Sequence, residues 1–246
     1  MSAWTGKQIG KYEVNELIGH GAIGEVYKGY HPALKREVAI KVIQTHTAKD
    51  PLAIKRFQRE AQIVAALRHP NIVQVHDFDI QEDTFYMVME FVPGQTLADV
   101  LRALRQENDR LSLTEAMRLF QLIAQAVAYA HGRGVVHGDL KPANVLLTSE
   151  RQPILADFGL SRMMGTERLA ETGSITGTPA YMSPEQCAGN PGEERSDIYS
   201  LGIMLYEMTT GSLPFSGDSI VAVLMKQIGE PPPPARSINR DLPTAL

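Results

Sequence analysis

The sequence has little cysteine, no surplus of positive charge and no long hydrophobic run. Its 246 residues include one cysteine, Cys187, which excludes an intrachain disulfide and a cysteine zinc cluster and favours a reducing compartment. With 24 basic and 28 acidic residues the net charge is 24 − 28 = −4, so a generally basic nucleic-acid binder is excluded. The longest apolar-leaning stretch, residues 119–132, falls short of the roughly 18 residues of a membrane-spanning helix. We expect a cytoplasmic protein with no membrane segment and no nucleic-acid partner.

The first part of the chain reads as a sheet with one helix. Hydrophobic residues make up 43% of the sequence, enough for a packed core. Alternating and β-branched residues predict strands over 12–18, 25–29, 37–43, 72–78 and 85–92. A helix is predicted from about 51 to 67, with Phe57, Ala61, Val64 and Leu67 on one face.

Helical periodicity dominates after the turn signal at Pro93-Gly94. One helix is expected to follow Ser112, which has the spacing of a reciprocal capping box with Glu115. Its predicted apolar positions are Met117, Phe120, Ile123, Ala124 and Val127. A second helix over 197–210 is expected to end at Gly211 and to carry Ile198, Leu201, Leu205 and Met208 on one side. The prediction is an α+β fold with an antiparallel-sheet unit, residues 1–92, and a mainly helical unit, residues 93–246.

Three glycines at positions 19, 21 and 24 lie between two predicted strands. A dinucleotide-binding glycine turn needs a helix directly after it, and here a strand follows. A glycine hairpin can fold over a polyphosphate and present backbone N–H groups to it. The alternative for this cluster taken alone is an ordinary turn.

Lys41 lies on a predicted strand between residues that should be buried. A buried ammonium needs a partner, and Glu60 shares the helix face of Phe57 and Val64. A Lys41–Glu60 pair could aim the lysine at phosphate oxygens. The alternative for either residue alone is a solvated side chain.

The densest group of polar residues falls in 135–147 and 154–159. Phosphate transfer to a hydroxyl needs a proton acceptor, oxygen ligands for Mg²⁺ and a nearby cation. Asp139, Asn144, Asp157 and Lys141 could supply these groups if a small hairpin joins residues 144 and 157. An isolated Asp-Phe-Gly is more often a turn, but the combination in this order favours phosphoryl transfer.

These motifs, together with Ser183-Pro-Glu185 and Asp197, resemble in order and spacing the eukaryotic-type (Hanks-type) serine/threonine protein kinases. Details such as Tyr181-Met-Ser-Pro-Glu-Gln186 are similar to bacterial members. The resemblance runs from about Tyr12 to the C-terminus. It implies the bilobal kinase fold, ATP and Mg as cofactors, and transfer of the γ-phosphate to a protein Ser/Thr hydroxyl, with self-phosphorylation included.

The resemblance also assigns roles to single residues. It implies catalytic roles for Asp139, Lys141, Lys41 and Glu60, and metal ligation by Asn144 and Asp157. It implies a gatekeeper at Met89 and adenine contacts from the backbone of Glu90 and Val92. The full set of implied ATP contacts is Gly19, His20, Gly21, Ala22, Ile23, Gly24, Val26, Ala39, Lys41, Met89, Glu90, Val92 and Leu146. The implied substrate and activation segment contains Thr172, Ser174, Thr176, Thr178 and Glu185.

Gly138 departs from the family, which usually has an arginine there to hold a phosphorylated activation loop. We expect the chemistry to survive and this route of control to be lost, so that phosphate on Thr172, Ser174 or Thr176 is not required. The alternative is that Arg162 or Arg168 binds a loop phosphate instead.

The second departure is at the end of the chain. Family members continue past Leu246 with two helices, one of which carries an arginine that pairs with the residue equivalent to Glu185. We therefore expect a C-terminally truncated kinase domain in which Glu185 is buried alone and the second unit is loosened. The alternative functions are a catalytically impaired nucleotide-binding scaffold (a truncated kinase or pseudokinase) and a small-molecule kinase, the latter disfavoured because residues 177–185 resemble a peptide-docking segment.

Overall fold

The structure is a computed structural model that describes residues 3–21, 24–43, 51–82, 84–158 and 179–244. The chain divides into two compact units, Met1–Pro93 and Gly94–Leu246. Among the described residues, no helix is both long and apolar enough to cross a membrane.

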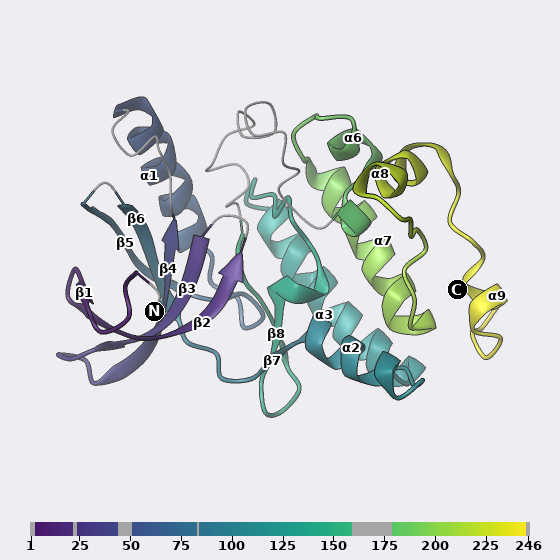
Figure 1. Cartoon of the computed structure of the whole chain (residues 1–246), viewed down its shortest axis with the longest axis horizontal. Coiled ribbons are helices and arrows are strands. Elements are labelled where there is room, and N and C mark those ends of the chain that lie inside the picture. Colours follow the sequence, from purple (N-terminus) through teal and green to yellow (C-terminus); the bar gives the residue numbers. More distant parts are fainter. Residues whose placement is uncertain (1–2, 22–23, 44–50, 83, 159–178, 245–246) are drawn as a thin grey trace. The chain divides into compact units, whose positions relative to one another are not determined.

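In its described residues, the first unit is a six-stranded antiparallel sheet with one helix, α1 (Figure 1). The strand order is β1-β2-β3-β4-β6-β5. The strands are β1 (Gln8–Ile9), β2 (Tyr12–Gly21), β3 (Gly24–His31), β4 (Arg36–Ile43), β5 (Val75–Gln81) and β6 (Thr84–Glu90), and α1 is Pro51–Ala65. The five predicted strands and the helix are therefore confirmed, although β5 begins three residues later than the sequence indicates.

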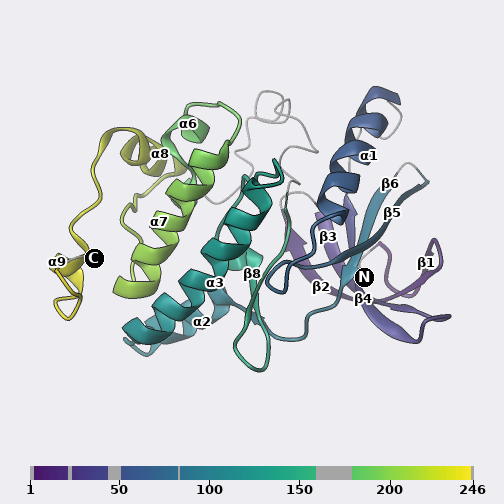
Figure 2. The same ribbon diagram turned by 180° about the vertical axis from the view of Figure 1, so that it is seen from behind.

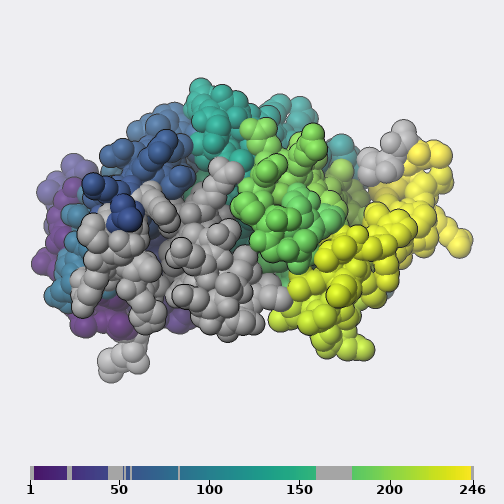
Figure 3. Space-filling model, turned by 90° about the horizontal axis from the view of Figure 1, so that it is seen from above, coloured from purple at the N-terminus to yellow at the C-terminus, as the bar shows by residue number. Residues whose placement is uncertain are grey.

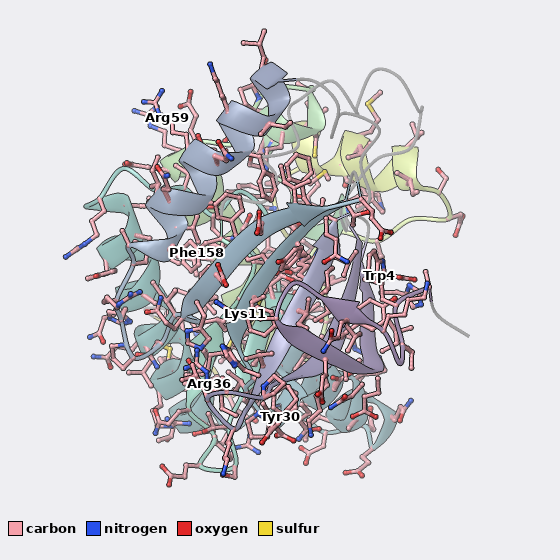
Figure 4. The ribbon with its side chains drawn as sticks, turned by 90° about the vertical axis from the view of Figure 1, so that its left-hand side faces the viewer. Trp4, Lys11, Tyr30, Arg36, Arg59 and Phe158 are labelled. Atoms are coloured by element: carbon pink, nitrogen blue, oxygen red, sulfur yellow. The ribbon has the colours of Figure 1, made fainter. Side chains whose placement is uncertain are left out.

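Both faces of this sheet are covered, which explains why β4 is buried from Val38 to Ile43. Val38, Ile40 and Val42 pack into one apolar cluster on the first face. On the other face Phe57 of α1 stacks on Phe85, with ring centroids 4.3 Å apart. All four apolar positions predicted for this helix are buried, although Leu67 lies just beyond the end of α1 at Ala65. The exposed Arg59 lies on the outward side of the helix (Figure 4).

The second unit is mainly helical, with a small three-stranded sheet of order β7-β8-β9. The longest helices, α3 and α7, pack against each other (Figure 2). The helices are α2 (Leu97–Gln106), α3 (Leu113–His131), α6 (Pro184–Cys187), α7 (Glu194–Thr210), α8 (Ile220–Gly229) and α9 (Ala235–Ile238). The remaining elements are β7 (Gln95–Thr96), β8 (Val145–Leu147), β9 (Pro153–Leu155) and the 3₁₀ turns η1 (Pro142–Asn144) and η2 (Pro179–Tyr181).

Two predicted core positions are wrong. Met117 is 37% exposed and Ile198 is 62% exposed. In α7 the first turn instead buries Ser196 and Asp197, whose side chains are satisfied by hydrogen bonds. A search for apolar residues at helical spacing misses a buried face that begins with polar residues.

The start of α3 and the end of α7 are as predicted, whereas α7 begins at Glu194, three residues before its predicted start. Ser112 accepts a hydrogen bond from the Glu115 N–H at 3.2 Å, and Gly211 ends α7 in the left-handed region at φ 77°. The reciprocal half of the capping box is wrong, because the Glu115 carboxylate binds Arg118 at 2.8 Å and Arg151 at 2.9 Å. Glu115 therefore ties α3 to the β8–β9 turn.

This ion pair predicts an acid-sensitive contribution to stability. Hydrogen bonds from Arg118 outweigh partial burial and, with those from Arg151, lower the pKa of Glu115 from 4.5 to about 2. Since the folded-state pKa is depressed, the contribution is present above pH 4.5 and is lost as the pH falls from 4.5 to 2. Glu115→Gln should cost about 1 kcal/mol at pH 6 and less at pH 3, measured by urea unfolding. An equal cost at both pH values, or an equal cost in the exposed control Glu230→Gln, would contradict this account.

Candidate active site

Side chains from three strands of the first unit gather on one face of its sheet. Lys41 of β4 pairs with Val26 on β3 and with Met87 on β6. Two residues further back, Ala39 pairs with Met89. Directly opposite residues project to the same face, so Val26, Ala39, Lys41 and Met89 share a face. Four of the predicted nucleotide contacts are thus brought together in register.

Helix α1 packs against this same face. Phe57 stacks on Phe85, which pairs with Ile43 two residues after Lys41. Glu60 follows Phe57 by one helical turn and is half-buried, while Lys41 is only 4% exposed. The arrangement places both residues on one side of the sheet and favours their pairing, which stays a prediction.

The glycine segment is a hairpin between the antiparallel strands β2 and β3, and Gly21 pairs with Gly24. Gly19 pairs with Val26. A Cβ added to Gly24 would lie 2.0 Å from the Val42 carbonyl oxygen, so this position admits glycine alone. The exposed His20 lies 3.7 Å from the Glu25 carboxylate. Ala22 and Ile23 lie outside the described residues.

Strand β6 ends at Glu90, one of the two residues whose backbone is predicted to hold adenine. The Glu90 N–H donates to the Gln74 carbonyl at 2.9 Å, which limits an adenine contact from this residue to its carbonyl oxygen. Val92 is half-buried, as is Leu146 on β8 of the second unit. Their contacts with adenine stay predictions.

The second unit brings Asp139, Lys141 and Asn144 together. Lys141 Nζ donates to Asp139 Oδ2 at 2.7 Å. Asn144 Nδ2 donates to the Asp139 carbonyl at 2.8 Å and to its Oδ2 at 3.2 Å. Two donors therefore hold the Asp139 carboxylate in a single orientation, both at the same oxygen.

Asp157 is brought to this group by the β8–β9 hairpin. The strands pair antiparallel from Val145 with Leu155 onward, as the spacing predicts. At the open end the Ala156 N–H donates to the Asn144 carbonyl at 2.9 Å. Asp157 follows in the left-handed region, with φ 68°. A non-glycine residue there costs about 1–2 kcal/mol, and such strain clusters at functional sites.

His137 connects the two loops that carry the carboxylates. Its ring is fully buried, with its centroid 4.6 Å from that of Phe158. The Asp139 N–H donates to Nδ1 at 3.3 Å, so Nε2 carries the proton and donates to the Ala156 carbonyl at 3.0 Å. The histidine is therefore a structural link between Asp139 and the residue before Asp157.

Asp197 anchors the backbone just before Asp139. It is 1% exposed and accepts hydrogen bonds from the N–H groups of His137 and Gly138, each at 2.8 Å. The His131 ring lies at the same distance from Oδ2. The sequence places Asp197 in the kinase pattern, but it does not show this anchoring role. A search by apolar spacing does not find it, because the buried first turn of α7 is polar.

Gly138 has a backbone role that the sequence analysis missed. Its φ is 76°, a conformation that glycine adopts without strain. Asp197 accepts its N–H, and Gln186 Nε2 donates to its carbonyl at 2.9 Å. The residue before Asp139 is thus held at both of its backbone polar groups.

The expectation that Glu185 is buried alone is wrong. Glu185 is half-buried, and Ser196 Oγ donates to its Oε1 at 2.6 Å. Partial burial by itself raises its pKa, but hydrogen bonds from Ser196 and Ser183 and the charge of Arg195 hold the pKa below its ordinary value. A hydroxyl on α7 satisfies the carboxylate that the sequence left without a partner. Thr172, Ser174, Thr176 and Thr178 lie outside the described residues, as do Gly159, Arg162 and Arg168.

Comparison with known proteins assigns the chain to one family. The family model described as protein kinase domain matches residues 12–240 of the sequence. The chain is 38% identical over 242 residues to the serine/threonine-protein kinase PrkC of Bacillus subtilis, covering 98% of this chain and 37% of that protein. It is 39% identical over 239 residues to the serine/threonine-protein kinase PknA of Mycobacterium tuberculosis, covering 95% of this chain and 54% of that protein.

A solved structure of a kinase domain is similar to this chain in fold. The crystal structure of the Mycobacterium tuberculosis PknI kinase domain matches with a TM-score of 0.74 and 29% sequence identity, covering 96% of this chain and 85% of that one. The predicted fold and the predicted bacterial type of relative are confirmed. The chain spans between 35% and 54% of the length of the curated relatives that it matches.

Proposed function

The chain belongs to the protein kinase domain family, and from this premise we propose that it transfers the γ-phosphate of ATP to a serine or threonine hydroxyl of a protein. The observation that carries the proposal is the group formed by Asp139, Lys141 and Asn144, with the backbone of Asn144 bound to the residue before Asp157. The relatives bear the name serine/threonine-protein kinase, and the alternative of a scaffold without turnover is not favoured.

Asp139 is the residue that receives the acceptor's proton in this proposal. Lys141 and Asn144 both donate hydrogen bonds to Oδ2 of Asp139. We therefore assign Oδ1 of Asp139 to the acceptor hydroxyl. The hydroxyl oxygen forms a bond to the γ-phosphorus while the bond from that phosphorus to the β,γ-bridging oxygen breaks, and the proton passes to Asp139. Position and charge supply most of the catalysis, and the enzyme forms no covalent intermediate.

The donor set of the second unit suits Mg²⁺. Nδ2 of Asn144 is used in hydrogen bonds to Asp139, so its Oδ1 is the atom left to act as a ligand. With the Asp157 carboxylate, it supplies the hard oxygen ligands that Mg²⁺ prefers. Bound Mg²⁺ would neutralise charge on the phosphates. In the first unit we assign Lys41, braced by Glu60, to the α- and β-phosphates.

A phosphate-transfer assay tests the proposal. With γ-labelled ATP, Mg²⁺ and myelin basic protein, the chain should move label onto serine or threonine of the acceptor or onto itself. A scaffold would transfer no label and would still be stabilised against thermal unfolding by Mg-ATP. We further propose that the protein is cytoplasmic and has no nucleic-acid partner. We also propose that the whole protein acts on a protein substrate with a serine or threonine acceptor.

A further inference from the structure

Gln227 is a buried amide in a helix that exposes several of its apolar side chains. It is 3% exposed, whereas Val221 and Met225 of the same helix, α8, are 60% and 65% exposed. A surface helix ordinarily buries its apolar residues and exposes its amides. A buried amide needs hydrogen-bond partners, so the contacts of Gln227 show what this helix holds.

Each polar atom of the Gln227 side chain has a partner. Nε2 donates to the carbonyls of Pro179 and Ala180, at 3.2 and 2.7 Å. Oε1 accepts a hydrogen bond from the Tyr199 hydroxyl of α7. Burial raises the pKa of Tyr199 to about 12, so the hydroxyl is a neutral donor over the physiological range. Tyr199 therefore fixes which end of the amide faces the two carbonyls.

The target of these bonds is η2, the turn of residues 179–181. Its third carbonyl, that of Tyr181, accepts a hydrogen bond from Ser200 Oγ at 2.7 Å. The Tyr181 hydroxyl donates to Glu207, which is 5% exposed. Side chains of α7 and α8 thus hold three consecutive carbonyls. Figure 3 shows the yellow residues near the end of the chain beside the green residues of the same unit.

The turn lies within residues 177–185, the segment for which the sequence predicts peptide docking. Hydrogen bonds to its three carbonyls hold this backbone in place. They involve neither Asp139 nor Lys141, whose side-chain hydrogen bonds to other described residues lie within residues 139–144.

We propose that Gln227, oriented by Tyr199, is a positioning residue that sets the geometry of the turn at 179–181 and so controls the binding of the protein acceptor and not of the nucleotide. The inference rests on the proposed kinase function. Loss of the amide leaves two half-buried carbonyls without their donor, and the turn then samples positions that bind the acceptor less well.

Steady-state kinetics with myelin basic protein as acceptor tests the proposal. Gln227→Leu keeps the size of the side chain and removes its hydrogen bonds, and Gln125→Leu, at an exposed glutamine of α3, is the matched control. Gln227→Leu should raise KM for the acceptor at least about fivefold and leave KM for ATP within about twofold. Tyr199→Phe should raise the acceptor KM less, and the double variant should equal Gln227→Leu alone, since both act through one amide.

Particular kinetic results would contradict the role proposed for Gln227. An unchanged acceptor KM in folded Gln227→Leu, or an equal rise in KM for ATP, overturns the proposal. If Gln227→Leu does not fold, Tyr199→Phe tests the proposal in its place, because this substitution removes only one hydroxyl. An unchanged KM for the acceptor in Tyr199→Phe would then overturn the proposal. Failure of the wild-type chain to transfer label either to the acceptor or to itself would instead refute the proposed function.

Discussion

Asp139→Asn should lower the rate of phosphate transfer about 10²–10⁴-fold, the usual contribution of a positioned proton acceptor. Asparagine keeps the shape of the side chain and can still accept a hydrogen bond from Lys141, which lies 2.7 Å from Oδ2 in the wild-type chain. It cannot take up the hydroxyl proton. The variant should therefore fold and bind Mg-ATP while losing turnover.

The measurement is the initial rate of label transfer to myelin basic protein, with the thermal shift on adding Mg-ATP recorded in parallel. Asp218→Asn is the control, because Asp218 is exposed and lies outside the catalytic loop. A drop of less than about tenfold in Asp139→Asn, with folding intact, would remove Asp139 from the role of proton acceptor.

Asp197→Asn should have the largest effect on stability. Its two carboxylate oxygens accept the N–H groups of His137 and Gly138 and face the ring of His131. The asparagine side chain has one acceptor oxygen and one NH₂ donor. One of the two buried backbone N–H groups would therefore face a donor in place of an acceptor. The expected loss is about 3 kcal/mol of unfolding free energy, equivalent to a fall in Tm of roughly 6–12 °C.

Urea and thermal unfolding of Asp197→Asn, again beside Asp218→Asn, measure this cost. Transfer activity should fall as well, since the backbone that leads to Asp139 loses its anchor. A Tm within about 2 °C of the wild type would mean that the hydrogen bonds of Asp197 do not hold the loop.

The sheet of the first unit and the loop of residues 137–144 could be predicted because their signals are local. Periodicity predicts the β-branched strands around Lys41 and the face of α1 that includes Phe57. Turn chemistry predicts the glycine that ends α7. The hairpin between Asn144 and Asp157 follows from their spacing. The candidate catalytic and metal-binding residues could be proposed from the sequence because the pattern of Asp139, Asn144 and Asp157 is itself short in sequence.

Other features depend on contacts between distant residues, which spacing does not reveal. Asp197 lies 60 residues from His137, and Gln227 lies 47 residues from Ala180. The partner of Glu185 is a hydroxyl on the next long helix, 11 residues away. The exposure of Ile198 follows from the same cause, because polar side chains occupy the buried face of the first turn of α7.

Analysis of the phosphorylated products tests the central claim most directly. The chain is incubated with γ-labelled ATP and Mg²⁺, alone and with myelin basic protein, and phosphosites are mapped by mass spectrometry. The account predicts phosphate on serine and threonine hydroxyls in the wild-type chain and at least a hundredfold less of it in Asp139→Asn, as expected for removal of a general base. Inorganic phosphate as the sole labelled product, or equal serine and threonine labelling by Asp139→Asn, would contradict it.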